Sequence, residues 1–341
     1  DLHRRRHSFP TRRSSDLAII FILLLVLMLT GMPISISLGL TVLTFLFTMT
    51  DVPIESVALK LFTGIEKFEI MAIPFFILAG NFLTHGGVAR RMINFATSMV
   101  GHWHGGLGLA GVLACALFAA VSGSSPATVV AIGSILLPAM VKQGFPNGFG
   151  AGVITTSGAL GILIPPSIVM VMYSVATNTS VGQLFMAGVI PGLVLATLLG
   201  LTTWYRARKF NYPRLVKATW AQRLSALRES IWGLFLIVVV IGGIYSGIFT
   251  PTEAAAMSAA YAFFVAVFVY KDLTLKQVPK VLLDSASMSA MLLYIITNAV
   301  LFSFLMTSEG IPQEMAAWLI DMGLGPVGFL LMVNILLLLA G

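Results

Sequence analysis

Residues 158–167 read GALGILIPPS, and this stretch decides how the chain folds. Pro165 and Pro166 have no N–H group, so carbonyls about one turn earlier, around Gly161, lose their helical donors. Each proline also disfavours the α conformation in the residue before it. Gly158 and Gly161 allow the backbone to bend without strain. The stretch therefore predicts a helix that breaks rather than one that continues.

A new helix can begin directly after the prolines, because Ser167 is suited to cap it. The predicted product is a discontinuous helix with free carbonyl oxygens. At membrane depth such backbone is tolerated only where it is buried in protein or lines a wet cavity. In transporters, unwound carbonyls coordinate Na⁺ and half-helix N-termini face anionic substrates. The alternative is a proline kink that serves packing alone.

Composition places this break inside a membrane protein. Hydrophobic residues make up 58% of the 341, charged residues only 10%, and the mean hydropathy is +0.97. No Asp, Glu, Lys or Arg occurs in residues 92–141, 143–205 or 285–308. Because about 20 apolar residues cross a bilayer, we expect an all-α polytopic membrane protein. The single cysteine, Cys115, excludes a disulfide framework or a thiolate metal site.

Both ends of the chain are unusual. Residues 1–16 carry five arginines and turn abruptly into AIIFILLLVLML, without a small-residue cleavage site. We interpret residues 1–16 as a non-native leader. The last residues, VGFLLMVNILLLLAG, stop within a hydrophobic run too short to cross, so we expect the C-terminal part to be missing.

A second break is expected at SGSSPATV, residues 122–129. Gly123 gives backbone freedom, and Pro126 suits the first turn of a following helix. The apolar arms on either side are each short for a full crossing, which favours a re-entrant hairpin. The alternative is a polar turn at the surface. Because the two breaks are close in sequence, we predict one shared ion and substrate site, formed by Ser122, Gly123, Ser124, Ser125, Thr128, Thr155, Thr156, Gly158, Gly161, Pro165, Pro166 and Ser167.

The chemistry of this site follows from what the sequence lacks. No carboxylate occurs between Glu69 and Glu229, which disfavours a proton relay there and favours Na⁺ held by neutral oxygens. A serine hydrolase using the SGSS serine is poorly supported, because the histidines of HWH at 102–104 lie in an interfacial stretch. We interpret HWH as an interface anchor and Arg90 and Arg91 as snorkelling side chains.

Charges set the orientation. Residues 206–230 hold seven Lys/Arg against one Glu, so by the positive-inside rule this loop is cytoplasmic. Crossings are expected at 184–205, 231–249, 253–270 and 286–306. The basic surplus thus reflects topology, and nucleic-acid binding is not expected. In TPTE, residues 250–253, the spacing predicts a capping box of Thr250, Pro251 and Glu253.

An internal repeat is also indicated. GMPISISLGLTVLTFLF (31–47) and GIFTPTEAAAMSAAYAFF (247–264) each place Gly and Pro before a helix rich in small residues. Inverted repeats are common in transporters. A counterpart of the Pro-Pro motif would then lie beyond residue 341.

Several long motifs carry a family resemblance. AIPFFILAGNFL, GHWHGGLG, FAAVSGSSPATVVAIGSILLPAM, GALGILIPPSIVMVMYSVATNTSVGQLFMAGVIPGL and GIYSGIFTPTEAAA occur in that order. From about residue 18 onward the chain resembles the large membrane subunit (DctM-like) of tripartite ATP-independent periplasmic (TRAP) transporters. Pro126 departs from the small residue usual after SGSS, and Trp103-His104 replaces a position that is often basic.

The resemblance implies Na⁺-driven import of organic acids such as C4-dicarboxylates or sialic acid across the bacterial inner membrane, without an enzyme activity or a cofactor other than the coupling ion. It implies two partners, a small membrane subunit (DctQ-like) and a periplasmic solute-binding protein (DctP-like). The alternative is a sodium/dicarboxylate or citrate-type carrier that works without a binding protein. The implied fold is an inverted-repeat elevator. Its parts would be scaffold helices and an interfacial arm (17–104), a first transport half (105–205), a basic loop with further scaffold helices (206–285), and an incomplete second transport half (286–341).

Overall fold

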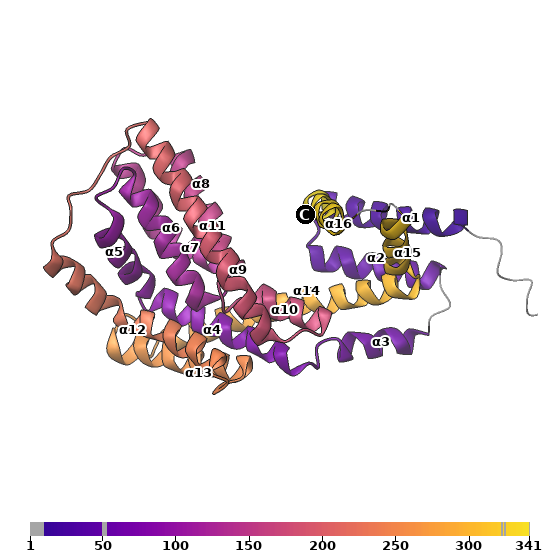
Figure 1. Cartoon of the computed structure of the whole chain (residues 1–341). Helices are drawn as coiled ribbons and strands as arrows, with labels where there is room; N and C mark the ends of the chain where they lie inside the picture. Colours follow the sequence, from indigo (N-terminus) through magenta and orange to yellow (C-terminus); the bar gives the residue numbers. More distant parts are fainter. Residues whose placement is uncertain (1–9, 50–52, 322, 324, 341) are drawn as a thin grey trace, which may run out of the picture. The chain divides into compact units, whose positions relative to one another are not determined.

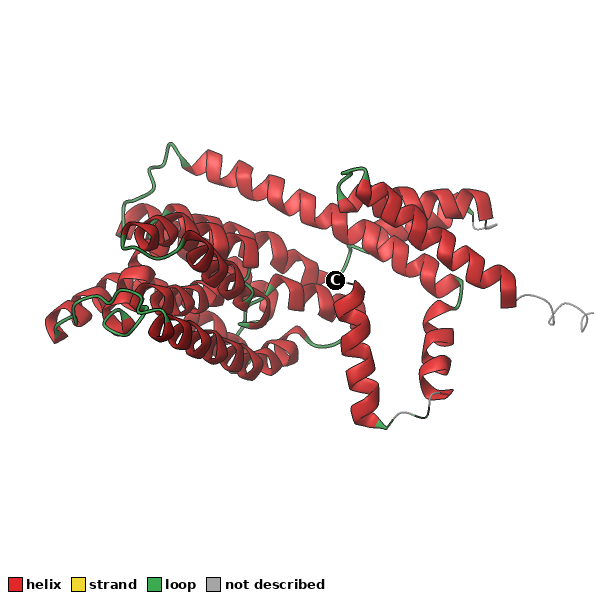
Figure 2. Cartoon of the chain, turned by 90° about the horizontal axis from the view of Figure 1, so that it is seen from above, coloured by secondary structure: helices red, strands yellow, loops and turns green. Residues whose placement is uncertain are grey.

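The computed structural model describes residues 10–49, 53–321, 323 and 325–340, and the described residues form helices and connections without a β-strand (Figures 1 and 2). The expected leader, residues 1–16, lies partly outside the described residues. The chain divides into two compact units, one made of residues 67–292 and the other of residues 1–66 and 293–341.

The larger unit contains most of the helices. They are η1 (Phe68–Met71), α4 (Ala72–His85), α5 (Val88–Val100), α6 (Gly106–Ser122), α7 (Ser125–Lys142), α8 (Asn147–Gly158), α9 (Leu160–Leu163), α10 (Ile168–Thr177), α11 (Val181–Lys209), α12 (Trp220–Tyr245), α13 (Pro251–Phe264), the π-helical turn η2 (Val265–Val269) and the first part of α14 (Val278–Ser308).

Helix α6 forms the centre of this unit and packs against α5, α7, α8, α9 and α11. Its sequence, GLGLAGVLACALFAAVS, is apolar or small on every face, and a helix that is apolar all round is buried. The small residues permit close approach: a Cβ on Gly111 would lie 2.8 Å from Leu136 Cδ2 of α7. Helix α6 is thereby held inside a shell of neighbouring helices, whereas α7 keeps exposed apolar side chains such as Val130.

Length and composition give the described part of the chain six helices able to cross a membrane, or up to seven if a bent pair counts as one span. The six cover 68–85, 125–142, 181–209, 220–245, 251–269 and 278–308, and the bent pair covers 147–163 and 168–177. The expected crossings at 184–205, 253–270 and 286–306 correspond to three of the six, and 231–249 corresponds to the later part of α12. The prediction of an all-helical polytopic membrane protein is confirmed.

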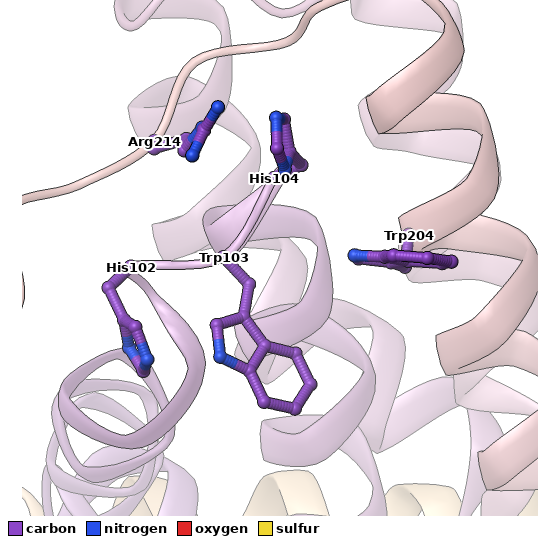
Figure 3. A pocket seen from close by; sticks show the side chains of 5 residues that line it. All are labelled: His102, Trp103, His104, Trp204 and Arg214. Carbon is purple, nitrogen blue, oxygen red and sulfur yellow. The ribbon is translucent and has the colours of Figure 1, made fainter.

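The basic segment 206–230 is mostly helical, which differs from the expected loop. Helix α11 continues to Lys209 and α12 begins at Trp220, so only residues 210–219 connect them. Thr219 and Gln222 form a capping box that starts α12 early. The connection passes close to the turn between α5 and α6, where Arg214 and His104 face a common space (Figure 3).

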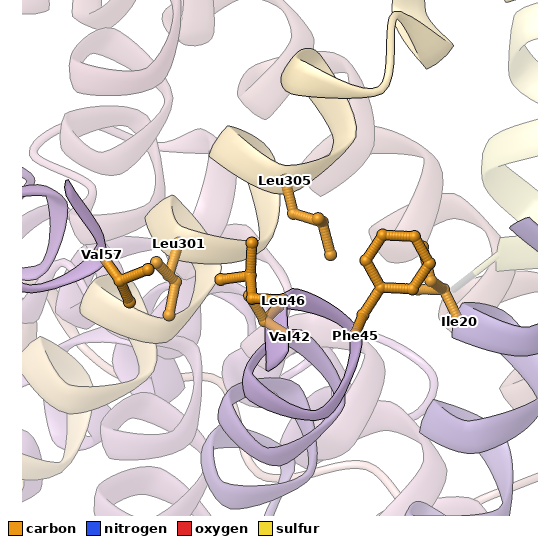
Figure 4. Close-up of a cluster of buried hydrophobic side chains, with 7 residues drawn as sticks. All are labelled: Ile20, Val42, Phe45, Leu46, Val57, Leu301 and Leu305. Carbon is orange, nitrogen blue, oxygen red and sulfur yellow. The ribbon is translucent and has the colours of Figure 1, made fainter. Parts of the chain in front are cut away.

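The smaller unit contains α1 (Pro10–Leu29), α2 (Ile34–Met49), α3 (Ile54–Thr63), the rest of α14, α15 (Ile311–Asp321) and α16 (Pro326–Ala340). As predicted, GMP at 31–33 separates two helices, with Gly31 at φ 84°. The core of this unit is an apolar cluster contributed by four helices and shown in Figure 4: Ile20, Val42, Phe45, Leu46, Val57, Leu301 and Leu305.

Candidate functional site: a hairpin turn against a broken helix

The turn between α6 and α7 is tight and capped. Helix α6 ends at Ser122, Gly123 adopts φ 61°, and α7 starts at Ser125. The Ser124 side chain accepts a hydrogen bond from the Ala127 amide at 3.5 Å. Pro126 lies in the first turn of α7, where its missing N–H has no consequence. The predicted break at SGSSP and the position of Pro126 are confirmed. The second arm is longer than expected, because α7 is long and apolar enough to cross a membrane, so the re-entrant hairpin stays a prediction.

Two buried hydroxyls close this turn. Ser122 and Thr128 are both fully buried, and their hydroxyl oxygens lie 3.0 Å apart. Thr128 Oγ1 also lies close to the Ser124 carbonyl. Each hydroxyl has one proton, so one of the two donates to the Ser124 carbonyl, at 2.8 Å from Thr128 or 3.5 Å from Ser122, and the other donates across the 3.0 Å contact. The pair therefore keeps free lone pairs but no free proton.

The GALGILIPPS stretch breaks the helix as predicted. Helix α8 ends at Gly158, α9 adds a single short turn, and Ile164 is extended with ψ 120°. The Pro165–Pro166 peptide is cis. The helical axis bends by 42° across the break. Ser167 caps α10, its side chain accepting from the Met170 amide at 3.5 Å.

The two breaks touch each other. The Gly123 carbonyl accepts a hydrogen bond from the Ile168 amide at 3.1 Å. A Cβ on Gly161 would lie 2.9 Å from the Ser124 carbonyl carbon and from the Ser125 amide nitrogen. The N-termini of α7 and α10 thus lie at one junction, which we call the hairpin junction (residues 122–128 and 157–168). The two breaks of the predicted site lie together, whereas Thr155 and Thr156 lie outside the junction. That these residues bind an ion or substrate stays a prediction.

The residues just before the break differ in burial. Thr155 and Thr156 are exposed on α8, and Thr156 Oγ1 lies 2.7 Å from the Gly152 carbonyl of its own helix. The next residue, Ser157, is fully buried and its hydroxyl has no hydrogen-bond partner among the described residues. Sequence reasoning did not single out Ser157. The signal was available, because Gly150, Ile154, Ser157 and Gly161 recur at helical spacing on one face.

The hairpin junction offers neutral ligands. Ser124 and Ser125 remain partly exposed, and the amides at the starts of α7 and α10 supply partial positive charge. Where residues are described, no group of three or more His, Cys, Asp or Glu could hold a metal ion. The arrangement can therefore offer hydroxyl and carbonyl oxygens to a cation and amides to an anion.

Other predicted features lie away from this junction. Thr250 and Glu253 form the predicted capping box, the Thr250 amide donating to Glu253 Oε2 at 2.8 Å, with Pro251 at the first helical position. The snorkelling interpretation of Arg91 is wrong. Arg91 is largely buried, pairs with Asp272 and lies 3.7 Å from the Tyr270 ring centroid, because α5 and the segment after η2 pack together.

Apolar spanning helices, a hairpin and a discontinuous helix that meet at a polar junction are typical of membrane transport proteins. A sequence profile described as "Tripartite ATP-independent periplasmic transporter, DctM component" matches residues 21–341. The chain belongs to this family, and it is a large permease subunit of a bacterial TRAP transporter, a multi-pass membrane protein.

Several curated relatives are similar over nearly the whole chain. The C4-dicarboxylate TRAP transporter large permease protein of Rhodobacter capsulatus is 77% identical over 337 residues, which is 95% of this chain and 77% of the relative. The protein of the same name from Pseudomonas aeruginosa is 54% identical, covering 89% and 71%. The sialic acid TRAP large permease of Vibrio cholerae is 36% identical, covering 92% and 74%.

Proposed function

We propose that this chain imports C4-dicarboxylates or closely related organic acids, driven by a Na⁺ gradient. The substrate class is supported by the high identity to relatives named for C4-dicarboxylates. The sialic acid relative is much less similar. The single observation that carries the proposal is the hydrogen-bonded contact of hairpin and broken helix, Gly123 O to Ile168 N at 3.1 Å.

Sodium suits this junction better than a proton does. A proton relay needs a group that titrates, whereas Na⁺ can be held by neutral oxygens such as unwound carbonyls. No Asp or Glu lies between Glu69 and Glu229. The ligands we propose are the SGSS hydroxyls and carbonyls, joined by carbonyls around Gly161. The buried, unpaired hydroxyl of Ser157 is a further candidate.

The anionic substrate needs hydrogen-bond donors rather than the oxygen ligands that hold Na⁺. Helix N-termini bind carboxylates through free amides and the helix dipole. Ser125 and Ile168 begin α7 and α10 within the hairpin junction. The Ile168 amide already donates to the Gly123 carbonyl. We propose that one carboxylate of the substrate faces the Ser125 amide, within the field of both helix N-termini, with the bound Na⁺ offsetting its charge.

The family is tripartite, and we propose its usual division of labour for this chain. A periplasmic solute-binding protein delivers the substrate, and a small membrane subunit braces the scaffold helices. The hairpin junction moves as part of an elevator-type transport domain. The inverted repeat and the cytoplasmic side of residues 206–230 belong to the same proposal, supported by the excess of Lys and Arg in that segment.

Transport assays test the coupling directly. The chain, in its whole protein with its two partners in proteoliposomes, should take up succinate when Na⁺ is high outside, and uptake should stop when the Na⁺ gradient is removed. Uptake that persists without Na⁺ and collapses with ΔpH alone would overturn the coupling. Succinate uptake without the binding protein would instead favour a sodium/dicarboxylate or citrate-type carrier, the alternative that does not fit the family match.

A further inference from the structure

A cavity open to the surface lies outside the hairpin junction, between two connections and helix α11 of the larger unit. It has a volume of about 350 Å³ and is lined by His102, Trp103, His104, Trp204 and Arg214 (Figure 3). The first three belong to the turn between α5 and α6, Trp204 to the end of α11, and Arg214 to the segment before α12. The transport mechanism proposed above uses none of these side chains.

The cavity is electropositive. Its lining contains one arginine and no acidic side chain. Arg208 stands beside it, with its guanidinium 5.5 Å from the Trp204 ring centroid. The pKa of His104 is lowered, first by desolvation and then by the charges of Arg214 and Arg208. The Nδ1 atom of His102 is buried without a hydrogen-bond partner in the described part of the chain. These features suit a small multivalent anion.

The walls are held in place by the fold. The Leu215 amide donates to the Gly101 carbonyl at 3.0 Å, which fixes the segment carrying Arg214 against the α5–α6 turn. Tyr212, in the same segment, lies on Phe149 with ring centroids 4.8 Å apart. The basic side chains are therefore brought together before any ligand arrives.

The order of side chains along one face of α11 indicates that the anion is the headgroup of a phospholipid. Leu201, Trp204 and Arg208 recur at i, i+3 and i+7, so they follow one another along that face. Leu201 is 55% exposed on a helix apolar enough to span a membrane. Toward the end of the helix, this face therefore presents first an apolar side chain, then an indole and then a cation. A phospholipid presents the matching order of acyl chain, glycerol ester and phosphate, and tryptophan prefers that interface.

We propose that this cavity binds the phosphate headgroup of an anionic phospholipid, with Arg214, Arg208 and His104 around the phosphate and the two indoles beside the glycerol. Basic pockets at helix ends are a known form of lipid recognition. Such a lipid fastens the α5–α6 turn to α11 at the membrane boundary.

The test uses the full chain purified in neutral detergent, titrated with phosphatidylglycerol or phosphatidylcholine and read out by native mass spectrometry. Phosphatidylglycerol should bind more tightly, and Arg214→Gln should weaken it about fivefold, the effect of one basic residue near an anionic surface. His104→Gln is a second variant on another segment. Lys217→Gln is the matched control, an exposed cation of the same connection that does not line the cavity.

Three results would overturn the proposal. One is equal affinity for the two lipids, and another is equal loss in Lys217→Gln and in Arg214→Gln. The third is displacement of the lipid by inorganic phosphate at equal concentration, which would show a site for a free anion. Retained helical circular dichroism and a single elution peak establish that each variant is folded. Should Arg214→Gln fail this check, His104→Gln decides alone.

Discussion

The carbonyl oxygen of Gly123 accepts a hydrogen bond from the amide of Ile168 at 3.1 Å, joining the hairpin turn to the second half of the broken helix. This bond gives the freed amide at the start of α10 a partner in another element. It also couples the two breaks, because moving one away from the other breaks this bond. An ion bound at either break would therefore stabilise both.

The close approach at the junction depends on Gly161. A methyl group there would lie 2.9 Å from backbone atoms of Ser124 and Ser125, which cannot rotate away. We expect Gly161→Ala to destabilise the protein by about 2 kcal/mol through overpacking and to abolish uptake. Thermal unfolding in detergent and proteoliposome uptake measure both effects.

Gly152→Ala is the control for this substitution. Gly152 lies in the same broken helix with nothing within 4 Å of an added Cβ, so alanine should stabilise α8 by about 0.5–1 kcal/mol. Equal loss of stability in both variants would show that helix flexibility, and not the contact with the hairpin, is what Gly161 provides.

Ser157→Ala separates ion binding from folding. The hydroxyl is buried without a partner, so its removal should leave the unfolding temperature unchanged or raise it slightly in Na⁺-free buffer. If Ser157 is a Na⁺ ligand, the stabilisation that Na⁺ gives the wild type should shrink in the variant. The measurement is the unfolding temperature at increasing NaCl, with choline chloride as the ionic-strength control. An identical Na⁺ response in both proteins would remove Ser157 from the site.

Ser124→Ala and Ser125→Ala address the turn itself. Loss of the Ser124 cap should cost about 1 kcal/mol of stability, whereas Ser125 caps nothing. Both variants should raise the Na⁺ concentration needed for half-maximal uptake. Unchanged Na⁺ activation in both would dismiss the hydroxyls of SGSS as ligands.

Glu253 is expected to act as a cap and not as a proton carrier. Its carboxylate accepts from the Thr250 amide at 2.8 Å, and glutamine can serve equally in a capping box. Glu253→Gln should keep stability and uptake near wild type, while Glu253→Ala should lower the unfolding temperature, because the Thr250 amide loses its acceptor. Uptake that fails in Glu253→Gln, with normal stability, would contradict the structural role.

Arg91 and its neighbour Arg90 give another matched pair. The Arg91 side chain is 15% exposed and pairs with Asp272, whereas Arg90 is 58% exposed and lies 3.4 Å from the same carboxylate. Arg91→Ala should destabilise by about 2 kcal/mol, because Asp272 loses a partner while partly buried. Arg90→Ala should change stability by less than about 0.5 kcal/mol. If the unfolding temperature falls equally in Arg91→Ala and Arg90→Ala, the pairing of Arg91 with Asp272 does not contribute more to stability than the exposed pair does.

Features decided by local backbone chemistry were predictable. Glycine and proline restrict the backbone wherever they occur, so the breaks at SGSSP and GALGILIPPS and the separation of α1 from α2 could be derived from sequence. The same holds for the caps at Ser167 and Thr250, because a cap joins residues three positions apart. The binding role of these residues is not a matter of backbone chemistry, and it stays a prediction.

Features that depend on distant partners were not predictable. The sequence predicted Arg91 to be a surface cation, because its partner Asp272 lies far away in the chain. Ser157 looked no different from Thr155 and Thr156 until packing buried one hydroxyl and exposed the others. The lengths of α11 and α12, which flank residues 210–219, were also not predicted. The charge of a segment indicates its side of the membrane but not where a helix ends.

By itself, then, the sequence determined a helical membrane protein with two interrupted segments, since missing amide donors and left-handed glycines act within a single turn. Only the tertiary structure decided that the two interruptions meet, which hydroxyl is left unpaired there, and that basic and indole side chains from two connections and α11 line one cavity. Those outcomes follow from burial and from contacts across long stretches of chain, which no local pattern specifies.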